Sequence, residues 1–160
     1  MTRSTFTPAL QLSVRAAVAA GAAVAAAQLL QLQYPIYALV GAVIVTDLSP
    51  LETRRLALRR FAGSVLGAIV GAALSRFLPA GPIAVALSIM LAMILSHVFR
   101  LEGAAKVTGY VCGIVILEHG EDSWFYALHR VLETLLGIGI AVLVSFVPKI
   151  LKTDTPPQPE

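Results

Sequence analysis

The arginines that stand inside or beside apolar stretches are the residues of this chain best suited to chemistry. Arg15 interrupts the first apolar stretch, while Arg60 and Arg130 directly precede the third and the sixth. An arginine at the centre of a membrane span costs roughly 2.5 to 3.5 kcal/mol, so it either snorkels to the interface or serves an anion in the interior. Arg60 and Arg130 also follow an acid, Asp47 and Glu118 respectively, at nearly the same distance. An ion pair with that acid is the alternative to binding an anion.

Chemistry other than anion binding finds little support in the sequence. It contains no nucleophile beside a base and none of the HExxH, GxSxG or phosphate-cradling loop patterns. The acidic stretch 118–122 lacks a recognised metal-ligand spacing, and Cys112 is the single cysteine. Glu133 stands three residues after Arg130, close enough on a helix for a local ion pair. We therefore expect no enzyme activity, no cofactor and no metal.

The elements that must position these residues are membrane-spanning helices. Hydrophobic residues make up 58% of the 160-residue chain and charged residues only 13%, well below the charged fraction of soluble domains. The apolar runs lack the alternation of a membrane strand, and helices are the other way to satisfy a backbone in lipid. The runs form six blocks, at residues 9–32, 34–46, 61–78, 83–99, 104–117 and 131–147.

We expect an all-α integral membrane bundle of about six transmembrane helices over residues 9–148. Several blocks are shorter than the roughly 20 residues that cross a bilayer, so they must tilt or shelter behind neighbours. Between the second and third blocks, Arg55 and Arg59 stand four residues apart, which predicts a short interfacial helix. Residues 1–8 form a short cytoplasmic tail in this interpretation, and the proline-rich residues 149–160 form a disordered one.

The distribution of positive charge predicts the orientation. With the N-terminus in the cytoplasm, most lysines and arginines outside the spans fall on the inner side, and only Arg76 and Arg130 fall on the outer side. Both termini are then cytoplasmic, as in a multi-pass protein of the cell inner membrane. This distribution accounts for the net charge of +3 without a nucleic acid partner.

The two halves of the chain resemble each other at an offset of about 70 residues. Residues 60–67 match residues 130–137 in arginine, hydroxyl residue, leucine and glycine, and residues 43–47 match residues 114–118. Three spans per half would give the repeats, about 9–78 and 80–148, inverted topology. The alternative is a chance similarity between apolar helices.

Glycines form a bare stripe on the third span. Gly63, Gly67 and Gly71 recur every four residues, and Gly137 is the repeat counterpart of Gly67. Small residues let neighbouring helix backbones approach closely in a membrane. We expect these four glycines to serve helix packing.

Three motifs of the chain have counterparts in a known group of membrane proteins. Tyr-Pro-Ile-Tyr-Ala at 34–38 opens the second span, while Arg-x-x-Gly-Ser-x-x-Gly at 60–67 and Arg-x-x-Glu-Thr-x-x-Gly at 130–137 open the third and the sixth. With them the chain resembles the six-helix membrane domain of the FUSC-like family, which comprises fusaric-acid-resistance proteins, aromatic-acid exporters and plant malate channels. It departs at Tyr37, where relatives often carry tryptophan, and we expect the membrane domain alone, without the cytoplasmic C-terminal domain of many relatives.

The resemblance implies passive or proton-coupled movement of organic anions, often by a dimer whose positive side chains line the path. We accordingly expect a transporter or channel that exports small organic anions, aromatic ones among them, as a homo-oligomer in the lipid bilayer. The alternative is a non-transporting membrane subunit or scaffold, whose charges only set topology and whose small-residue stripes bind another membrane protein. The candidate substrate-binding residues are Arg15, Arg60, Arg130 and Tyr37.

Overall fold

The computed structural model describes residues 3–79, 81–118 and 122–147, and within these ranges all regular secondary structure is helical. This confirms the all-α class and the six predicted helices. Three of them are long and apolar enough to cross a membrane, with candidate spans at Pro8–Leu29, Pro50–Leu74 and Ser123–Ser145. The elements are α1 (Arg3–Leu29), α2 (Pro35–Val45), α3 (Pro50–Leu74), α4 (Pro82–Val98), the 3-10 helix η1 (Glu102–Ala104), α5 (Ala105–Glu118) and α6 (Ser123–Ser145). The predicted C-terminal tail, 149–160, lies outside the described residues.

Prolines set the start of three helices. Pro35, Pro50 and Pro82 are the first residues of α2, α3 and α4, where a missing N–H costs no hydrogen bond. Because α3 starts at Pro50 and continues to Leu74, the predicted separate interfacial helix is wrong. Its leucines, alanines and arginines are good helix formers, so the charged segment simply forms the first turns of α3.

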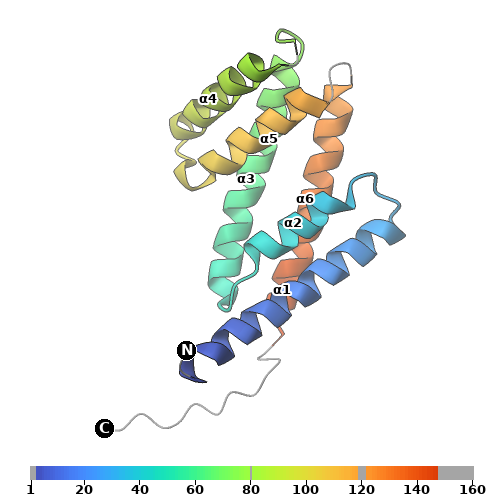
Figure 1. Ribbon diagram of the computed structural model, residues 1–160, viewed down its shortest axis with the longest axis vertical. Coiled ribbons are helices and arrows are strands. Elements are labelled where there is room, and N and C mark those ends of the chain that lie inside the picture. Colours follow the sequence, from blue (N-terminus) through green and yellow to red (C-terminus); the bar gives the residue numbers. More distant parts are fainter. Residues whose placement is uncertain (1–2, 80, 119–121, 148–160) are drawn as a thin grey trace.

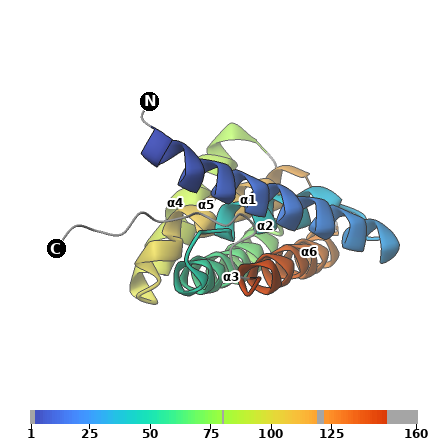
Figure 2. The ribbon, with the colours of Figure 1, turned by 90° about the horizontal axis from the view of Figure 1, so that it is seen from below.

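Two helical hairpins pack against a central pair of helices (Figure 1). The central helices α3 and α6 run in opposite directions, and Figure 2 shows them side by side with α1 crossing the pair. In the first hairpin α2 packs mainly on α6, and in the second α5 packs mainly on α3. Each half of the chain therefore places its middle helix on the last helix of the other half.

Glycines stand where these helices approach most closely. A Cβ atom at Gly67 would lie 2.5 Å from the carbonyl oxygen of Thr108 in α5. A Cβ atom at Gly137 would collide with the backbone carbonyl of Ala38 in α2. No side chain fits either gap without separating the helices. Gly63 and Gly71 face the same helix as Gly67, against Val107 and Val115.

The interior is filled by small residues, and the large apolar side chains point outward. Alanines line the buried contact of α1 and α2 with α6, whereas leucine, isoleucine and phenylalanine side chains are exposed on every α-helix. This is the reverse of a soluble core, and it suits a molecule whose solvent is lipid. Examples of the buried and exposed sets are Ala19, Ala23 and Ala42, and Leu29, Phe77, Ile83 and Leu143.

Candidate functional site

All four tyrosines of the chain gather with two arginines where α2, α3, α5 and α6 meet. Tyr34 lies just before α2 and Tyr37 in its first turn, and Tyr126 lies in the first turn of α6. The ring centroid of Tyr126 is 5.2 Å from that of Tyr34 and 6.2 Å from that of Tyr37. Tyr110, from the middle of α5, belongs to the same group because the guanidinium groups of Arg60 and Arg130 both lie near its ring. We call these four rings the tyrosine cluster.

Arg130 lies against the faces of these rings. Its guanidinium carbon is 3.9 Å from the ring centroid of Tyr37 and 6.0 Å from that of Tyr110, within the range of a cation–π contact. One terminal nitrogen also donates to the hydroxyl oxygen of Tyr126 at 3.4 Å. Arg130 is 3% exposed, and its Nε atom has no hydrogen-bond partner in the described part of the chain.

Arg60 approaches the same cluster from α3. Its guanidinium carbon lies 5.6 Å from the ring centroid of Tyr110, and its side chain is 4% exposed. Its Nε and Nη1 atoms have no hydrogen-bond partner among the described residues. The hydroxyl groups of Ser64 and Tyr110 are buried and unpaired in the same way. The site therefore contains several buried donors with no acceptor.

The ion pairs that were the alternative for these arginines do not form among the described residues. Among the described residues the structure contains one ion pair, 3.2 Å between Arg55 and Glu52 on the surface of α3. The charged atoms of Arg60 and Asp47 are more than 4.0 Å apart, so their alternative pairing is wrong, and Asp47 accepts a hydrogen bond from the backbone N–H of Ser49. The alternative pair of Arg130 with Glu118 and the local pair with Glu133 are wrong for the same reason: their charged atoms are more than 4.0 Å apart.

Glu118 and the tyrosine hydroxyls form a chain of hydrogen bonds that leads out of the cluster. The hydroxyl of Tyr126 donates to a carboxylate oxygen of Glu118 at 2.7 Å, and that of Tyr37 reaches the same oxygen at 3.5 Å. The hydroxyls of Tyr37 and Tyr126 also contact each other. Because Glu118 is exposed at the end of α5, the chain of hydrogen bonds connects the buried arginines to one surface of the bundle.

Glu133 is a fully buried carboxyl group on the other side of Arg130 along α6. Its Oε1 atom accepts the backbone N–H of Tyr34 at 2.7 Å, directly before α2 begins at Pro35. An acid is well placed there because the first N–H groups of a helix lack partners inside it. Its Oε2 atom has no partner in the part of the chain that the structure describes.

Arg15 lies apart from the tyrosine cluster. Its guanidinium donates to the backbone carbonyls of Leu48 and Val147 at 2.9 Å and of Asp47 at 3.4 Å. Val147 lies beyond the end of α6, roughly 25 Å along the helix direction from Arg130 at 1.5 Å per residue. Arg15 thus joins α1 to the ends of α2 and α6, where carbonyl groups lack partners inside their own helices. This placement favours a structural role.

Sequence reasoning identified three members of this site and missed the rest. Arg60, Arg130 and Tyr37 were candidates and lie together, while Tyr34 and Ser64 were noted only as members of motifs and Tyr110 and Tyr126 were not noted. A usable signal was present for three of the four tyrosines, because Tyr34, Tyr37 and Tyr110 fall in apolar blocks, whereas Tyr126 lies five residues before the sixth block. Among the described residues no group of acids, histidines and cysteines could hold a metal, and residues 119 to 121 of the acidic stretch are not described.

The arrangement can bind and orient an anion, since the unpaired atoms of Arg60 and Arg130 in the described part of the chain are donors and aromatic rings stand beside them. A family model described as "Aromatic acid exporter family member 1" matches residues 12–147 of the chain, which includes all of the candidate residues. Neither the curated proteins nor the solved structures include a match to the chain.

Proposed function

The chain belongs to the aromatic acid exporter family, and on that basis we propose that it exports small organic anions, aromatic carboxylates among them, across the inner membrane. Family membership suggests a membrane transporter rather than an enzyme. The proposal adds the class of substrate, the direction of transport and the site that recognises the substrate.

The observation that carries the proposal is the pair of buried arginines without a carboxylate partner. Taking a guanidinium out of water is expensive unless its charge and its N–H groups are matched. Among the described residues, Arg60 and Arg130 leave three N–H-bearing atoms without a partner, beside the unpaired hydroxyl of Ser64. A ligand that arrives with a carboxylate would supply the missing acceptors.

The tyrosine cluster favours an aromatic carboxylate over a purely aliphatic one. The rings of Tyr34, Tyr37 and Tyr126 already meet edge-on or tilted, with centroids 5.2 to 6.2 Å apart. A substrate ring can join such a group with the same geometry, for about 0.5 to 1.5 kcal/mol beyond its area burial. Arg60, Arg130 and Tyr37 are therefore the substrate-binding residues of this proposal.

We further propose a bundle of six spans built from two inverted repeats, with both termini cytoplasmic. Matching contacts at the 70-residue offset support it: Gly67 abuts the carbonyl of Thr108 as Gly137 abuts that of Ala38. The outer face of α3 and α6 carries two grooves whose lining residues also correspond at this offset. These are Arg54, Ala57, Leu58 and Phe61 in one groove, and Trp124, Ala127, Leu128 and Val131 in the other.

The ends of α1 and α4 add to this correspondence. Two residues after each helix ends, a non-glycine residue adopts the left-handed conformation, Gln31 at φ 52° and Arg100 at φ 58°. The site then lies between the two halves, where inverted-repeat transporters hold their substrates and open alternately to each side. The exposed apolar side chains that line the two grooves on α3 and α6, Leu58, Phe61, Trp124 and Leu128, offer a second copy a surface to pack on, in keeping with a homo-oligomer.

The experiment that tests the function is uptake into liposomes carrying the purified, folded protein, with empty liposomes as the reference. A panel of benzoate-like acids, malate and a neutral aromatic alcohol separates charge from ring recognition. We expect selective flux of the aromatic carboxylates. Absence of flux for every anion would contradict the proposal and favour the non-transporting subunit, and a membrane partner that co-purifies in stoichiometric amount would identify it.

A further inference from the structure

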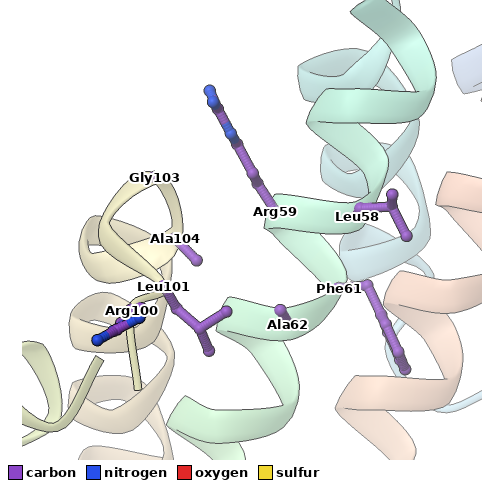
Figure 3. Close-up of a pocket in the computed structure, with 8 residues that line it drawn as sticks. All are labelled: Leu58, Arg59, Phe61, Ala62, Arg100, Leu101, Gly103 and Ala104. Atoms are coloured by element: carbon purple, nitrogen blue, oxygen red, sulfur yellow. The ribbon is translucent and has the colours of Figure 1, made fainter. Parts of the chain in front are cut away.

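A second candidate site lies on the surface of α3, away from the tyrosine cluster. A groove of about 520 Å³ runs between α3 and the connection from α4 to α5, as Figure 3 shows. Its floor is apolar, with Leu58, Phe61 and Leu101 among its lining residues. Arg59 and Arg100 stand on opposite margins of this floor. The groove thus combines two cations with a surface for hydrocarbon.

The backbone around the groove accommodates both arginines. Arg59 passes so close to Gly103 that a Cβ atom there would lie 2.7 Å from its Nε atom. Arg100 occupies the position after the end of α4 where the chain turns left-handed, with φ 58°. Its N–H donates to the carbonyl of His97 and that of Leu101 to the carbonyl of Ser96, which is the Schellman ending that normally carries glycine. Arginine at this position therefore carries backbone strain that glycine would avoid.

The groove lies where the charged start of α3 gives way to its apolar part. Arginines occupy four positions of the segment 54–60, and after residue 60 the helix carries no further charged residue. In a membrane protein such a boundary falls at the level of the lipid headgroups, with acyl chains on its apolar side. The apolar floor therefore meets hydrocarbon where the two arginines meet headgroups.

We propose that this groove binds one molecule of an anionic phospholipid. The phosphate accepts hydrogen bonds from the guanidinium groups of Arg59 and Arg100, which suit phosphate oxygens better than an ammonium does. The acyl chain covers Leu58, Phe61 and Leu101. Charge complementarity selects this occupant, because a zwitterionic lipid brings an ammonium group to the same two cations. The site is independent of the proposed transport function.

The test measures the melting temperature of the detergent-solubilised protein while phosphatidylglycerol, phosphatidylcholine or inorganic phosphate is added. We expect phosphatidylglycerol to raise the melting temperature by several degrees more than phosphatidylcholine does. The double substitution Arg59→Gln and Arg100→Gln should abolish this difference. Arg55→Gln, which removes a surface arginine of the same helix that is 63% exposed, should retain it.

A second pair of variants separates lipid binding from folding. Arg100→Gly relieves the left-handed backbone, so it should raise the melting temperature without lipid but lose much of the phosphatidylglycerol effect. Gln31→Gly makes the same backbone change at the end of α1, and it should raise the melting temperature and keep the full lipid effect.

Three results would overturn the proposal. One is an equal rise with both lipids, and another is an equal loss of the lipid effect in Arg55→Gln, since either would indicate a general surface effect. The third is a rise with inorganic phosphate that matches the rise with phosphatidylglycerol, since that would show an ion site without a lipid chain.

Discussion

Arg130 is stabilised by ring faces and one hydroxyl rather than by a carboxylate, although Glu133 lies one turn away on the same helix. The carboxyl group of Glu133 is held instead by the N–H of Tyr34. This division leaves the positive charge of the site available to a substrate. It also assigns Glu133 a structural contact that can be tested by itself.

Replacing Glu133 separates its role as an acceptor from its charge. Glu133→Gln keeps a carbonyl oxygen for the N–H of Tyr34, so we expect most of the stability to remain. Glu133→Leu leaves that N–H buried without a partner and should cost about 1 to 3 kcal/mol of unfolding free energy. Thermal unfolding of both variants in the same detergent is the measurement. An equal loss in the two variants would contradict the assigned contact.

Arg15 should matter for stability and not for substrate recognition. Arg15→Gln removes donors that serve the carbonyls of Asp47, Leu48 and Val147, and we expect it to cost about 1.5 to 3 kcal/mol of unfolding free energy. Flux per folded molecule should stay close to that of the wild type. Melting temperature and liposome flux, measured on one preparation, check both parts. A stable variant with strongly reduced flux would return Arg15 to the substrate path.

At this scale the sequence predicted the charged part of the site better than the aromatic part. Arg60 and Arg130 are conspicuous because charge is costly in an apolar run. Tyr110 and Tyr126 look like ordinary interface or packing residues, and only the packing of α5 and α6 brings them beside the arginines. The role of Arg15 also could not be read from the sequence, because its acceptors are backbone carbonyls of other elements.

Where two helix backbones approach closely, the contact depends on single glycines. Gly137 lies against the carbonyl of Ala38, whereas Gly139, two residues further along α6, has open space where a Cβ atom would be. The two glycines therefore form a matched pair in one helix. Their alanine variants differ in packing and share the same gain in helix propensity.

Gly137→Ala should lower the unfolding free energy by about 1 to 3 kcal/mol, because α2 must move away from α6. Gly139→Ala should be neutral or stabilising by up to about 1 kcal/mol. The melting temperatures of the two purified variants test this. Similar values for both would mean that α2 and α6 are not in the close contact described here.

Helix types were predictable from the apolar blocks, while helix starts were not. The third block was placed at 61–78, yet α3 starts at Pro50 because a helix continues through charged residues with good propensity. In the same way α6 starts at Ser123 although its apolar block begins at 131. The apolar pattern reports the part of a helix that meets lipid, and the proline or turn before it reports where the helix begins.

For the whole molecule, the arrangement of two hairpins on a central helix pair explains why the site lies where it does. α3 and α6 each bring one arginine to the middle, and α2 and α5 bring aromatic residues to the same place. The offset of about 70 residues was visible in the sequence, but it could not show that each middle helix packs on the other half. Because each middle helix packs on the other half, residues of both halves surround the candidate site.

The central claim is that Arg60 and Arg130 recognise the carboxylate of an aromatic substrate. The most direct test is benzoate flux into liposomes carrying the wild type, the Arg60→Gln and Arg130→Gln variants, or the surface control Arg55→Gln, at equal amounts of folded protein. We predict a loss of roughly tenfold or more for either interior variant, the effect of one charge-assisted hydrogen bond of about 1.5 to 3 kcal/mol, and no loss for the control. Wild-type flux in both interior variants would contradict the account.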